Sequence, residues 1–392
     1  MKKLLSIILS LIMAMSVLVI PATVSAKETK KVPNTYVNEW FNDSSTSGIY
    51  IPNKGTVHVY DGTNIDELRF TPLKGKTITL DKCIRDDEGN DRSFNGYYVR
   101  GNKVYYCIMK QRKKGYLYQF KTIDINGKNK KIIYSRSLKS SDLDLIGGYG
   151  SGVIFSEDRY EHKIDKTLYT YKIFRYNKVT TLFKFYSSGV VRKRIFGGKI
   201  FYGQHAYDLA TGKTKSFVTK EKYITKNYMY YINKNNNLKS LDKNGTIRLV
   251  AKNIYEYLNA DDNKSVVYSK LNKDNEIVYY SRTGTDKEVE LCTEKDLRNL
   301  VGKSNEKLFK VGAVLHKNKV YFSTCEGKED KVYDGYFDYD GIEYAYIVTV
   351  DLKGGTPKVY YEAPYGYDIN MWIFNNTFRY SYYDPFDDVV DD

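Results

Sequence analysis

The chain of 392 residues carries 62 Lys and Arg against 47 Asp and Glu, which gives a net charge of +15 at pH 7. Aromatic residues make up 15% of it, with 40 Tyr, whereas Pro occurs only 7 times. This composition favours pleated, half-buried strands with intact hydrogen-bond ladders. No long helical pattern runs through the sequence, which excludes an all-helical fold, and the lack of a C-x-x-C motif leaves a zinc or thioredoxin-type site without support.

The first 26 residues predict a signal peptide. Lys2 and Lys3 precede an apolar segment from Leu4 to Ile20, and Val24-Ser25-Ala26 supplies the small residues that a signal peptidase requires. We predict cleavage after Ala26 and a protein secreted to the cell exterior, with non-covalent association with the cell wall left open. The alternative is retention as an anchoring helix, because about 17 apolar residues are at the lower limit of a membrane span. No later segment approaches that apolar length, so no integral membrane segment is expected after cleavage.

The mature chain stays basic. Cleavage lowers the net charge from +15 to +13, because Lys2 and Lys3 are removed. An exported basic protein is expected to bind anionic partners such as a cell-wall polymer or an acidic polysaccharide, and no nucleic acid is expected. The alternative is an ordinary solvated surface, since the lysines are spread along the chain among acidic residues.

After an N-terminal extension over 27–44, a short apolar and aromatic strand core recurs along the chain. The gaps between successive starts range from 29 to 54 residues, which suits four short antiparallel strands per repeat, as in a propeller blade of about 40–50 residues. We therefore predict an all-β fold, a β-propeller over 45–383 with mostly four-stranded antiparallel blades. Seven blades are expected, with eight as the alternative. The cores begin at Val57, Val104, Val153, Ile200, Met229, Val266, Val320 and Met371.

A second recurrent feature is a turn that starts with Asp and ends with Gly. An Asp side chain can accept a hydrogen bond from the backbone two residues on, and Gly adopts the positive φ that a tight hairpin needs. Apolar residues resume directly after each turn, so each predicts a hairpin between two strands. The turns are Asp124–Gly127, Asp208–Gly212, Asp242–Gly245 and Asp351–Gly354.

The C-terminal part predicts one short helix and a ring closure. Glu294 to Leu300 is the only segment with a helical pattern. Strands near Ile373 and Phe378–Tyr380 are expected to pair with the N-terminal strand near Ile49–Ile51, because such pairing removes exposed sheet edges. The acidic tail 384–392 is expected to be a frayed, solvated end.

The recurrence of the strand core with the Asp-x-x-Gly turn resembles the β-propeller built from YWTD repeats in low-density-lipoprotein receptors. It resembles more closely the uncharacterised secreted propeller-like proteins of Gram-positive bacteria. The Trp-Thr-Asp of the receptor repeat is missing here, because Tyr105 is followed by Tyr106-Cys107-Ile108. The ligand-binding residues of the receptor family therefore cannot be assigned to positions in this chain.

Four cysteines fall into two local pairs, Cys83 with Cys107 and Cys292 with Cys325. Export permits disulfides, and four cysteines allow three connectivities. Local pairing is the expected connectivity, and buried free thiols are the alternative.

Residues for catalysis are harder to find. The four His, at positions 58, 162, 205 and 316, share no metal-binding spacing, and Gly147–Gly152 lacks the Lys and the helix of a phosphate-binding loop. We assign no catalytic residue, no cofactor and no metal, apart from a weak calcium candidate at Asp338 and Asp340.

Aromatic loops offer more support for binding. Tyr336 and Tyr339 in one loop, and Tyr365 and Tyr367 in another, are candidates for stacking on a sugar or holding a peptide. We therefore expect an exported, non-enzymatic binding or scaffold protein, monomeric, whose propeller face binds a protein or a cell-envelope polymer. The alternative is a secreted carbohydrate-active enzyme, a glycosidase or lyase, whose carboxylates meet only in three dimensions.

Overall fold

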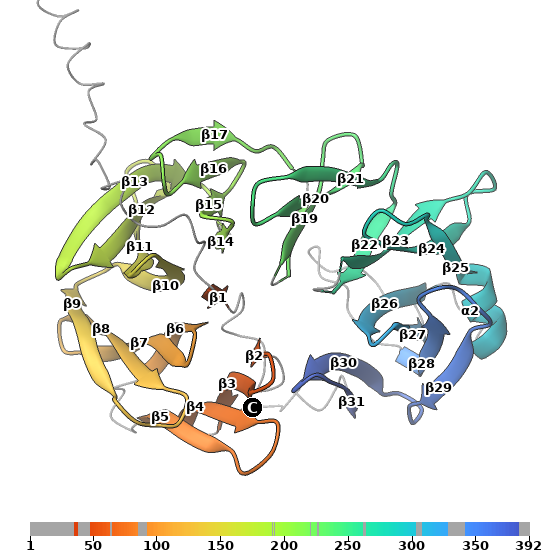
Figure 1. Ribbon diagram of the computed structural model, residues 1–392, viewed down its shortest axis with the longest axis horizontal. Helices are drawn as coiled ribbons and strands as arrows, with labels where there is room; N and C mark the ends of the chain where they lie inside the picture. Colours follow the sequence, from red (N-terminus) through yellow and green to blue (C-terminus); the bar gives the residue numbers. More distant parts are fainter. Residues whose placement is uncertain are drawn as a thin grey trace, which may run out of the picture.

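The computed structural model describes residues 35–37, 48–62, 65–84, 92–189, 191, 193–219, 221–225, 227–261, 264–302, 308–327 and 342–383. The predicted signal peptide and the acidic tail lie outside these residues. In Figure 1 the described strands form successive antiparallel sheets arranged in a ring, in the order of the chain. The first strand of a sheet lies toward the centre of the ring and the last toward the outside. The chain is an all-β propeller, as the sequence predicts.

The first four sheets are numbered in chain order. Sheet 1 contains β2 (Ile49–Ile51), β3 (Gly55–Asp61), β4 (Ile65–Pro72) and β5 (Ile78–Ile84). Sheet 2 contains β6 (Arg92–Arg100), β7 (Lys103–Arg112), β8 (Gly115–Asp124) and β9 (Lys131–Leu138), with β1 (Thr35–Val37) added beside β6. Sheet 3 contains β10 (Asp142–Tyr149), β11 (Gly152–Glu161), β12 (Lys166–Arg175) and β13 (Lys178–Ser187). Sheet 4 contains β14 (Arg194–Phe196), β15 (Lys199–Tyr202), β16 (His205–Asp208) and β17 (Thr214–Ser216).

The remaining sheets complete the ring. Sheet 5 contains β18 (Glu221–Ile224), β19 (Tyr228–Ile232), β20 (Leu238–Asp242) and β21 (Ile247–Ala251). Sheet 6 contains β22 (Glu256–Ala260), β23 (Ser265–Leu271), β24 (Ile277–Thr283) and β25 (Val289–Thr293), followed by helix α2 (Glu294–Val301). Sheet 7 contains β26 (Leu308–His316), β27 (Lys319–Gly327), β28 (Ile342–Asp351) and β29 (Lys358–Glu362). Sheet 8 contains only β30 (Asp368–Phe374) and β31 (Thr377–Tyr383).

The repeat predicted from the sequence corresponds to fixed positions in the sheets. Seven of the eight predicted cores lie in the second strand of a sheet, and the eighth, at Met371, lies in β30. The described residues form seven sheets of at least four strands and one two-stranded sheet, and the expected number of blades therefore stays a prediction.

The Asp-to-Gly turns are hairpins, as predicted, and in the structure each joins the third strand of a sheet to the fourth. In sheet 2 the Gly127 N–H donates to the Asp124 carbonyl at 2.8 Å, and Gly127 has a φ of +79°. The residue after the Asp has a second role, because the Ile125 N–H donates to the Asn102 carbonyl in the turn between the first two strands. Leu209 and Leu352 bond to the equivalent turns of sheets 4 and 7 at 3.0 and 2.8 Å. In sheets 2, 4 and 7 the turn between the first two strands is thus tied to the turn between the last two.

Hydrophobic cores fill the spaces between neighbouring sheets. One cluster of buried residues lies between each successive pair from sheets 1 and 2 to sheets 7 and 8. Because side chains alternate along a strand, adjacent residues serve different cores. Tyr106, for example, packs between sheets 1 and 2, whereas Cys107 packs between sheets 2 and 3.

The same alternation shows that the expected disulfides are wrong. Cys83 lies in the core between sheets 1 and 2, and Cys107 lies on the opposite side of sheet 2. Cys292 lies between sheets 6 and 7, whereas Cys325 packs against the core between sheets 7 and 8. A sheet therefore separates the two thiols of each local pair, and none of the four forms a disulfide. Burial raises the pKa of the Cys107 thiol well above its usual value, which makes it unreactive.

The expected pairing of C-terminal and N-terminal strands is also wrong. β2 pairs with β3, and β30 pairs with β31 through a two-residue turn. Asn375 and Asn376 form this turn with φ values of +50° and +56°, the left-handed pair that favours a tight local hairpin. Sheet 8 instead meets sheet 1 through side chains: Asn375 Nδ2 donates to the Pro72 carbonyl at 3.4 Å, and the Phe374 ring meets the His58 ring.

The predicted helix is confirmed as α2. A capping box begins it, with the Asp296 N–H donating to Thr293 Oγ1 at 3.0 Å and the Thr293 N–H donating to Asp296 Oδ2 at 2.8 Å. Leu297 and Val301 bury the inner side of the helix in the core between sheets 6 and 7. Across the described ranges, no helix has the length and apolar character needed to cross a membrane.

Stability is expected to depend on the charge of His58. The ring is buried against Phe374 with centroids 5.2 Å apart, and Nε2 lies 3.0 Å from Thr71 Oγ1. Burial, with Arg69 nearby, lowers the pKa of His58 to about 4. An unfolded His titrates near pH 6.5, so folding favours the neutral ring. The stability that this contributes is complete above about pH 6.5 and falls as the pH drops toward 4, by about 3 kcal/mol.

Urea unfolding from pH 7 to pH 4 measures this loss. The variant His58→Gln should lose much of the pH dependence, whereas His162→Gln, which changes an exposed His, should retain it. An unchanged pH profile in His58→Gln would contradict the assignment.

Candidate functional site

The structure describes two of the four candidate binding tyrosines. Tyr336 and Tyr339, like the calcium candidates Asp338 and Asp340, lie outside the described residues. Tyr365 is 67% exposed in the connection from β29 to β30, with its ring 5.4 Å from that of Tyr344. Tyr367 instead packs into the core between sheets 7 and 8, its ring 5.4 Å from that of Tyr382. Tyr365 is thus available to a ligand, whereas Tyr367 is structural.

Over the ranges that the structure describes, no group of three or more His, Cys, Asp or Glu side chains is placed to hold a metal ion. The histidines lie in different sheets or turns, and His58 is occupied by its contacts with Thr71 and Phe374.

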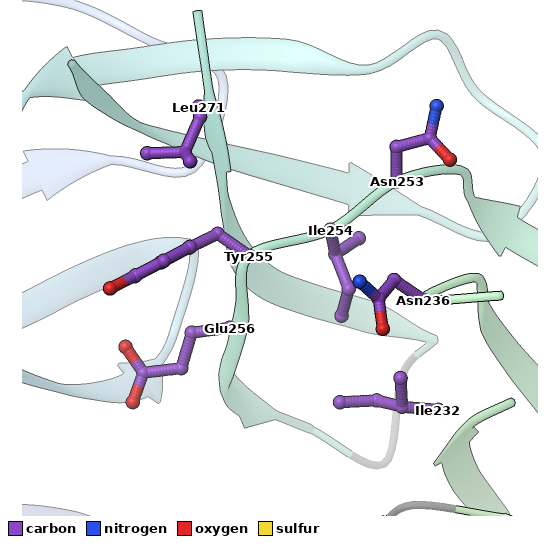
Figure 2. Close-up of a pocket in the computed structure, with 7 residues that line it drawn as sticks. All are labelled: Ile232, Asn236, Asn253, Ile254, Tyr255, Glu256 and Leu271. Atoms are coloured by element: carbon purple, nitrogen blue, oxygen red, sulfur yellow. The ribbon is translucent and has the colours of Figure 1, made fainter. Parts of the chain in front are cut away.

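A hollow of about 670 Å³ opens between sheets 5 and 6. It is formed by the end of β19 and the following turn, by the connection from β21 to β22, and by the end of β23. Figure 2 shows the connection crossing the middle of this site, with the Tyr255, Glu256 and Leu271 side chains gathered on one side of it. The lining residues are Ile232, Asn236, Asn253, Ile254, Tyr255, Glu256 and Leu271.

Backbone hydrogen bonds hold the connection in place. The Ile254 N–H donates to the Asn236 carbonyl at 2.9 Å, and the Tyr255 N–H donates to the Ser269 carbonyl at 2.8 Å. Asn236 and Asn253 both adopt left-handed backbone conformations, with φ of +56° and +51°, which Asn tolerates better than most residues. The connection is therefore fixed to the β19–β20 turn on one side and to β23 on the other, and a ligand meets a preformed surface.

The lining combines apolar and polar chemistry. Ile232 and Ile254 are buried and form an apolar floor, since both belong to the core between sheets 5 and 6. Tyr255 is 57% exposed and Leu271 is 46% exposed. The amide of Asn253 both donates and accepts hydrogen bonds, and the carboxylate of Glu256 accepts them. Such a surface suits a ligand with apolar faces and many hydroxyl groups.

Sequence reasoning missed this hollow. Its residues come from three segments that the fold brings together, and none of them carries a known motif. The run Asn235-Asn236-Asn237 was an available signal of left-handed turn conformations. Nothing in the sequence indicated that Tyr255 would lie beside that turn.

A second chemically rich cluster lies on the face of sheet 3 that is directed at sheet 4. The strand register places Asp142 of β10 opposite Asp158 of β11, with Asp144 on the same face. Lys193, in the connection to sheet 4, donates hydrogen bonds to both Asp144 and Asp158. Its ammonium also lies 5.3 Å from the centre of the Tyr169 ring. Within the described part of the chain the hydroxyl of Tyr171, buried in the same core, has no hydrogen-bond partner.

The charges in this cluster perturb one another. Burial raises the pKa of Asp158, and it outweighs the opposing effect of Lys193. Burial and the nearby Asp144 raise the pKa of Asp142. For Lys193, burial lowers the pKa, but Asp144 and Asp158 outweigh it and the net pKa is raised. We interpret Lys193 as a buried cation that ties the connection to sheet 3.

Comparisons with known proteins assign no family. No family model matches the chain, and no curated protein matches it. Solved structures that resemble it include the acylaminoacyl peptidase of Pyrococcus horikoshii, at 13% identity over 72% of this chain and 49% of that chain, with a TM-score of 0.39. Another is the β-propeller domain of the trilobed protease of Pyrococcus furiosus, at 9% identity over 73% of this chain and 93% of that chain, with a TM-score of 0.32.

A third is the WD40 domain of SCAP from fission yeast, at 8% identity over 78% of this chain and 73% of that chain, with a TM-score of 0.29. The chain spans about half the length of the Pyrococcus horikoshii peptidase, and 63% of a chain from a yeast complex of Dbp5 with Nup159 and Gle1. At these TM-scores the similarities indicate neither family nor activity. The resemblance to YWTD propellers and to proteins of Gram-positive bacteria stays a prediction.

Removing the Lys193 ammonium is expected to destabilise the fold. In Lys193→Met, the carboxylates of Asp144 and Asp158 lose their cation, and breaking this partly buried ion pair should cost about 2 kcal/mol, between the values for an exposed and a fully buried pair. Because Asp158 has a raised pKa, protonation relieves its burial as the pH falls, so the cost should be larger at pH 7 than at pH 4.

Urea unfolding at both pH values tests this. The control Lys199→Met removes a more exposed partner, 3.6 Å from Asp208, and should cost less than about 1 kcal/mol. Equal losses in the two variants would show that Lys193 does not act as a buried cation.

Proposed function

We propose that the protein is an exported binding protein that holds an anionic cell-envelope polysaccharide in the hollow between sheets 5 and 6. Export rests on the predicted signal peptide at 1–26. The observation that carries the binding role is the exposed Tyr255 ring, which lies on the same side of the connection as the Glu256 carboxylate, while the Asn253 amide lines another part of the hollow (Figure 2). An aromatic face can cover the apolar face of a sugar ring while neighbouring polar groups hydrogen-bond its hydroxyls.

The size and openness of the site fit a polymer. About 670 Å³ lies within the usual range of ligand sites, about 300–1,000 Å³. The lining residues Asn253, Tyr255 and Glu256 are all exposed, so a chain can enter and leave without threading through an enclosed cavity.

The charge around the hollow supports an anionic ligand. Lys234, Lys252 and Lys273 are exposed and flank Asn236, Asn253 and Leu271 respectively along the chain. They add local positive charge to a chain that is already basic overall. Such charge attracts an anionic polymer over distances up to the Debye length, about 8–10 Å at moderate salt.

A second candidate function is a secreted carbohydrate-active enzyme. The observation that favours it is the convergence of Asp142, Asp144 and Asp158, two of them with a raised pKa. Perturbed carboxylates gather at active sites. Release of reducing ends from wall polysaccharide, lost in Asp142→Asn, would favour this function over simple binding.

The binding role predicts a specific loss in Tyr255→Ala. Without the ring, affinity for purified cell-wall polysaccharide should fall at least about fivefold, because one stacking contact is worth about 1 kcal/mol or more. Co-sedimentation with isolated cell walls measures it. The matched control is Tyr186→Ala, which removes a half-exposed ring from β13 in sheet 3.

The same co-sedimentation experiment can be repeated at several salt concentrations. Binding should weaken as the salt concentration rises, and it should do so less in a variant with Lys234, Lys252 and Lys273 changed to Gln. If Tyr255→Ala binds like the wild type, or if salt has no effect on binding, the proposed site is wrong.

A further inference from the structure

Sheet 8 differs from every other sheet in its number of strands. In each of the seven other sheets, two more strands follow the strand that carries the recurrent apolar core. In the described part of the chain, sheet 8 ends at β31. In Figure 1, β30 lies nearer the ring centre and β31 lies outward. The outward edge of β31 therefore carries backbone groups that β30 does not pair, and such an edge is a template for another strand.

β31 is built more firmly than an isolated hairpin would be. Phe378 stacks on Tyr321 with centroids 3.8 Å apart, and Tyr380 lies 4.6 Å from Tyr361. Both partners belong to sheet 7. Because a lone two-stranded hairpin is at best marginally stable in water, this packing is what holds β31 in place. A rigid edge lowers the entropy cost of adding a strand.

The usual protection against strand addition is absent from β31. In six of the seven larger sheets, the pairing of the last two strands contains a register shift, which bends the outer edge. The β30–β31 ladder runs through seven pairs without a shift. β31 also contains no Pro and only one charged residue, Arg379. Natural sheets protect exposed edges with register shifts, Pro or several charged residues. Because β31 lacks a register shift and Pro and has a single charge, its edge is suited to pairing with another strand.

The register identifies the groups that face outward. The closing pair of the two-residue hairpin, Phe374 with Thr377, is a hydrogen-bonded pair, and the pairs then alternate. Phe378, Tyr380 and Tyr382 therefore direct their N–H and C=O groups away from β30. Tyr380 and Tyr382 are also 37% and 49% exposed, so they offer aromatic surface to the incoming strand.

We propose that the β31 edge is a docking site for an extended segment of a partner protein, which adds as a third antiparallel or parallel strand. This interaction is separate from the polysaccharide site between sheets 5 and 6. The segment should alternate apolar with acidic residues. Its apolar side chains would cover Tyr380 and Tyr382, and its acidic ones would meet Arg379 and the exposed Lys74 and Lys76, which follow Pro72 beside the β30–β31 turn.

A second copy of this chain does not fit the same edge. Sheets 7 and 1 flank sheet 8, and each has four strands where sheet 8 has two. β31 is therefore recessed by about two strand spacings, roughly 10 Å. In a dimer built on paired β31 edges, the outer strands of the flanking sheets would meet first. A single extended segment or a hairpin reaches the edge without that conflict.

The test selects a phage-displayed library of random linear peptides on the full folded chain and measures the affinity of the enriched peptides. Binding should weaken at least about tenfold in Tyr380→Pro, which removes an outward N–H but no β30–β31 hydrogen bond. The control Tyr380→Val also loses the ring but keeps the N–H, so it should lose clearly less affinity than Tyr380→Pro. No enriched peptide, or equal binding by the wild type and Tyr380→Pro, would overturn the proposal.

Hydrogen exchange in the free protein gives an independent readout. The N–H groups of Phe378, Tyr380 and Tyr382 should exchange faster than those of Arg379 and Ser381, and peptide should slow only the first set. If the outward N–H groups are already protected without peptide, another segment of this chain or a second copy occupies the edge, and the proposal is wrong. Light scattering on the same sample identifies which of the two it is.

Discussion

Each sheet of the ring has to bury two faces, and the rest of the structure depends on this constraint. Seven hydrophobic clusters satisfy it, one in each space from sheets 1 and 2 to sheets 7 and 8. The second strand of a sheet lies inside the meander and is covered on both faces, so it carries a short run of adjacent apolar residues. Val266 and Tyr268 face sheet 5 while Val267 faces sheet 7. The apolar strand core that recurs in the sequence therefore results from burial of both faces of the second strand.

The constraint is met least well where the chain closes the ring. Sheet 8 packs one face on sheet 7 through an aromatic core, whereas its contacts with sheet 1 among the described residues include the His58–Phe374 ring contact and a hydrogen bond from Asn375 to the Pro72 carbonyl. A buried neutral imidazole stabilises a contact less than an aliphatic core does, because it loses hydration that a single hydrogen bond only partly replaces. The last sheet is therefore held mainly by one neighbour. The predicted pH dependence of His58 is therefore placed at the junction where sheet 8 is held least firmly.

Local features of this fold could be predicted from the sequence, and features that depend on neighbouring sheets could not. The strand cores, the Asp-to-Gly hairpins and the α2 capping box each lie within a short segment, so their residues carry the signal. The disulfide prediction failed because Cys83 and Cys107 lie on opposite faces of sheet 2, which their closeness in the sequence does not reveal. The closure prediction failed because two adjacent left-handed Asn residues direct β31 back onto β30. The Lys193 cluster was missed because only the strand register brings Asp142 and Asp158 together.

The hollow between sheets 5 and 6 follows from strand length. The predicted cores there start 29 and 37 residues after the preceding ones, the two shortest gaps in the chain. β19 and β20 have five residues each, whereas β11 and β12 have ten. Because these strands end early, the β19–β20 turn lies next to the connection from β21 to β22, and the outer edge of the core at Ile232 and Ile254 lines the floor of the hollow. The residues that can contact a ligand are thus placed by a shortened repeat, and no local motif is required to mark them.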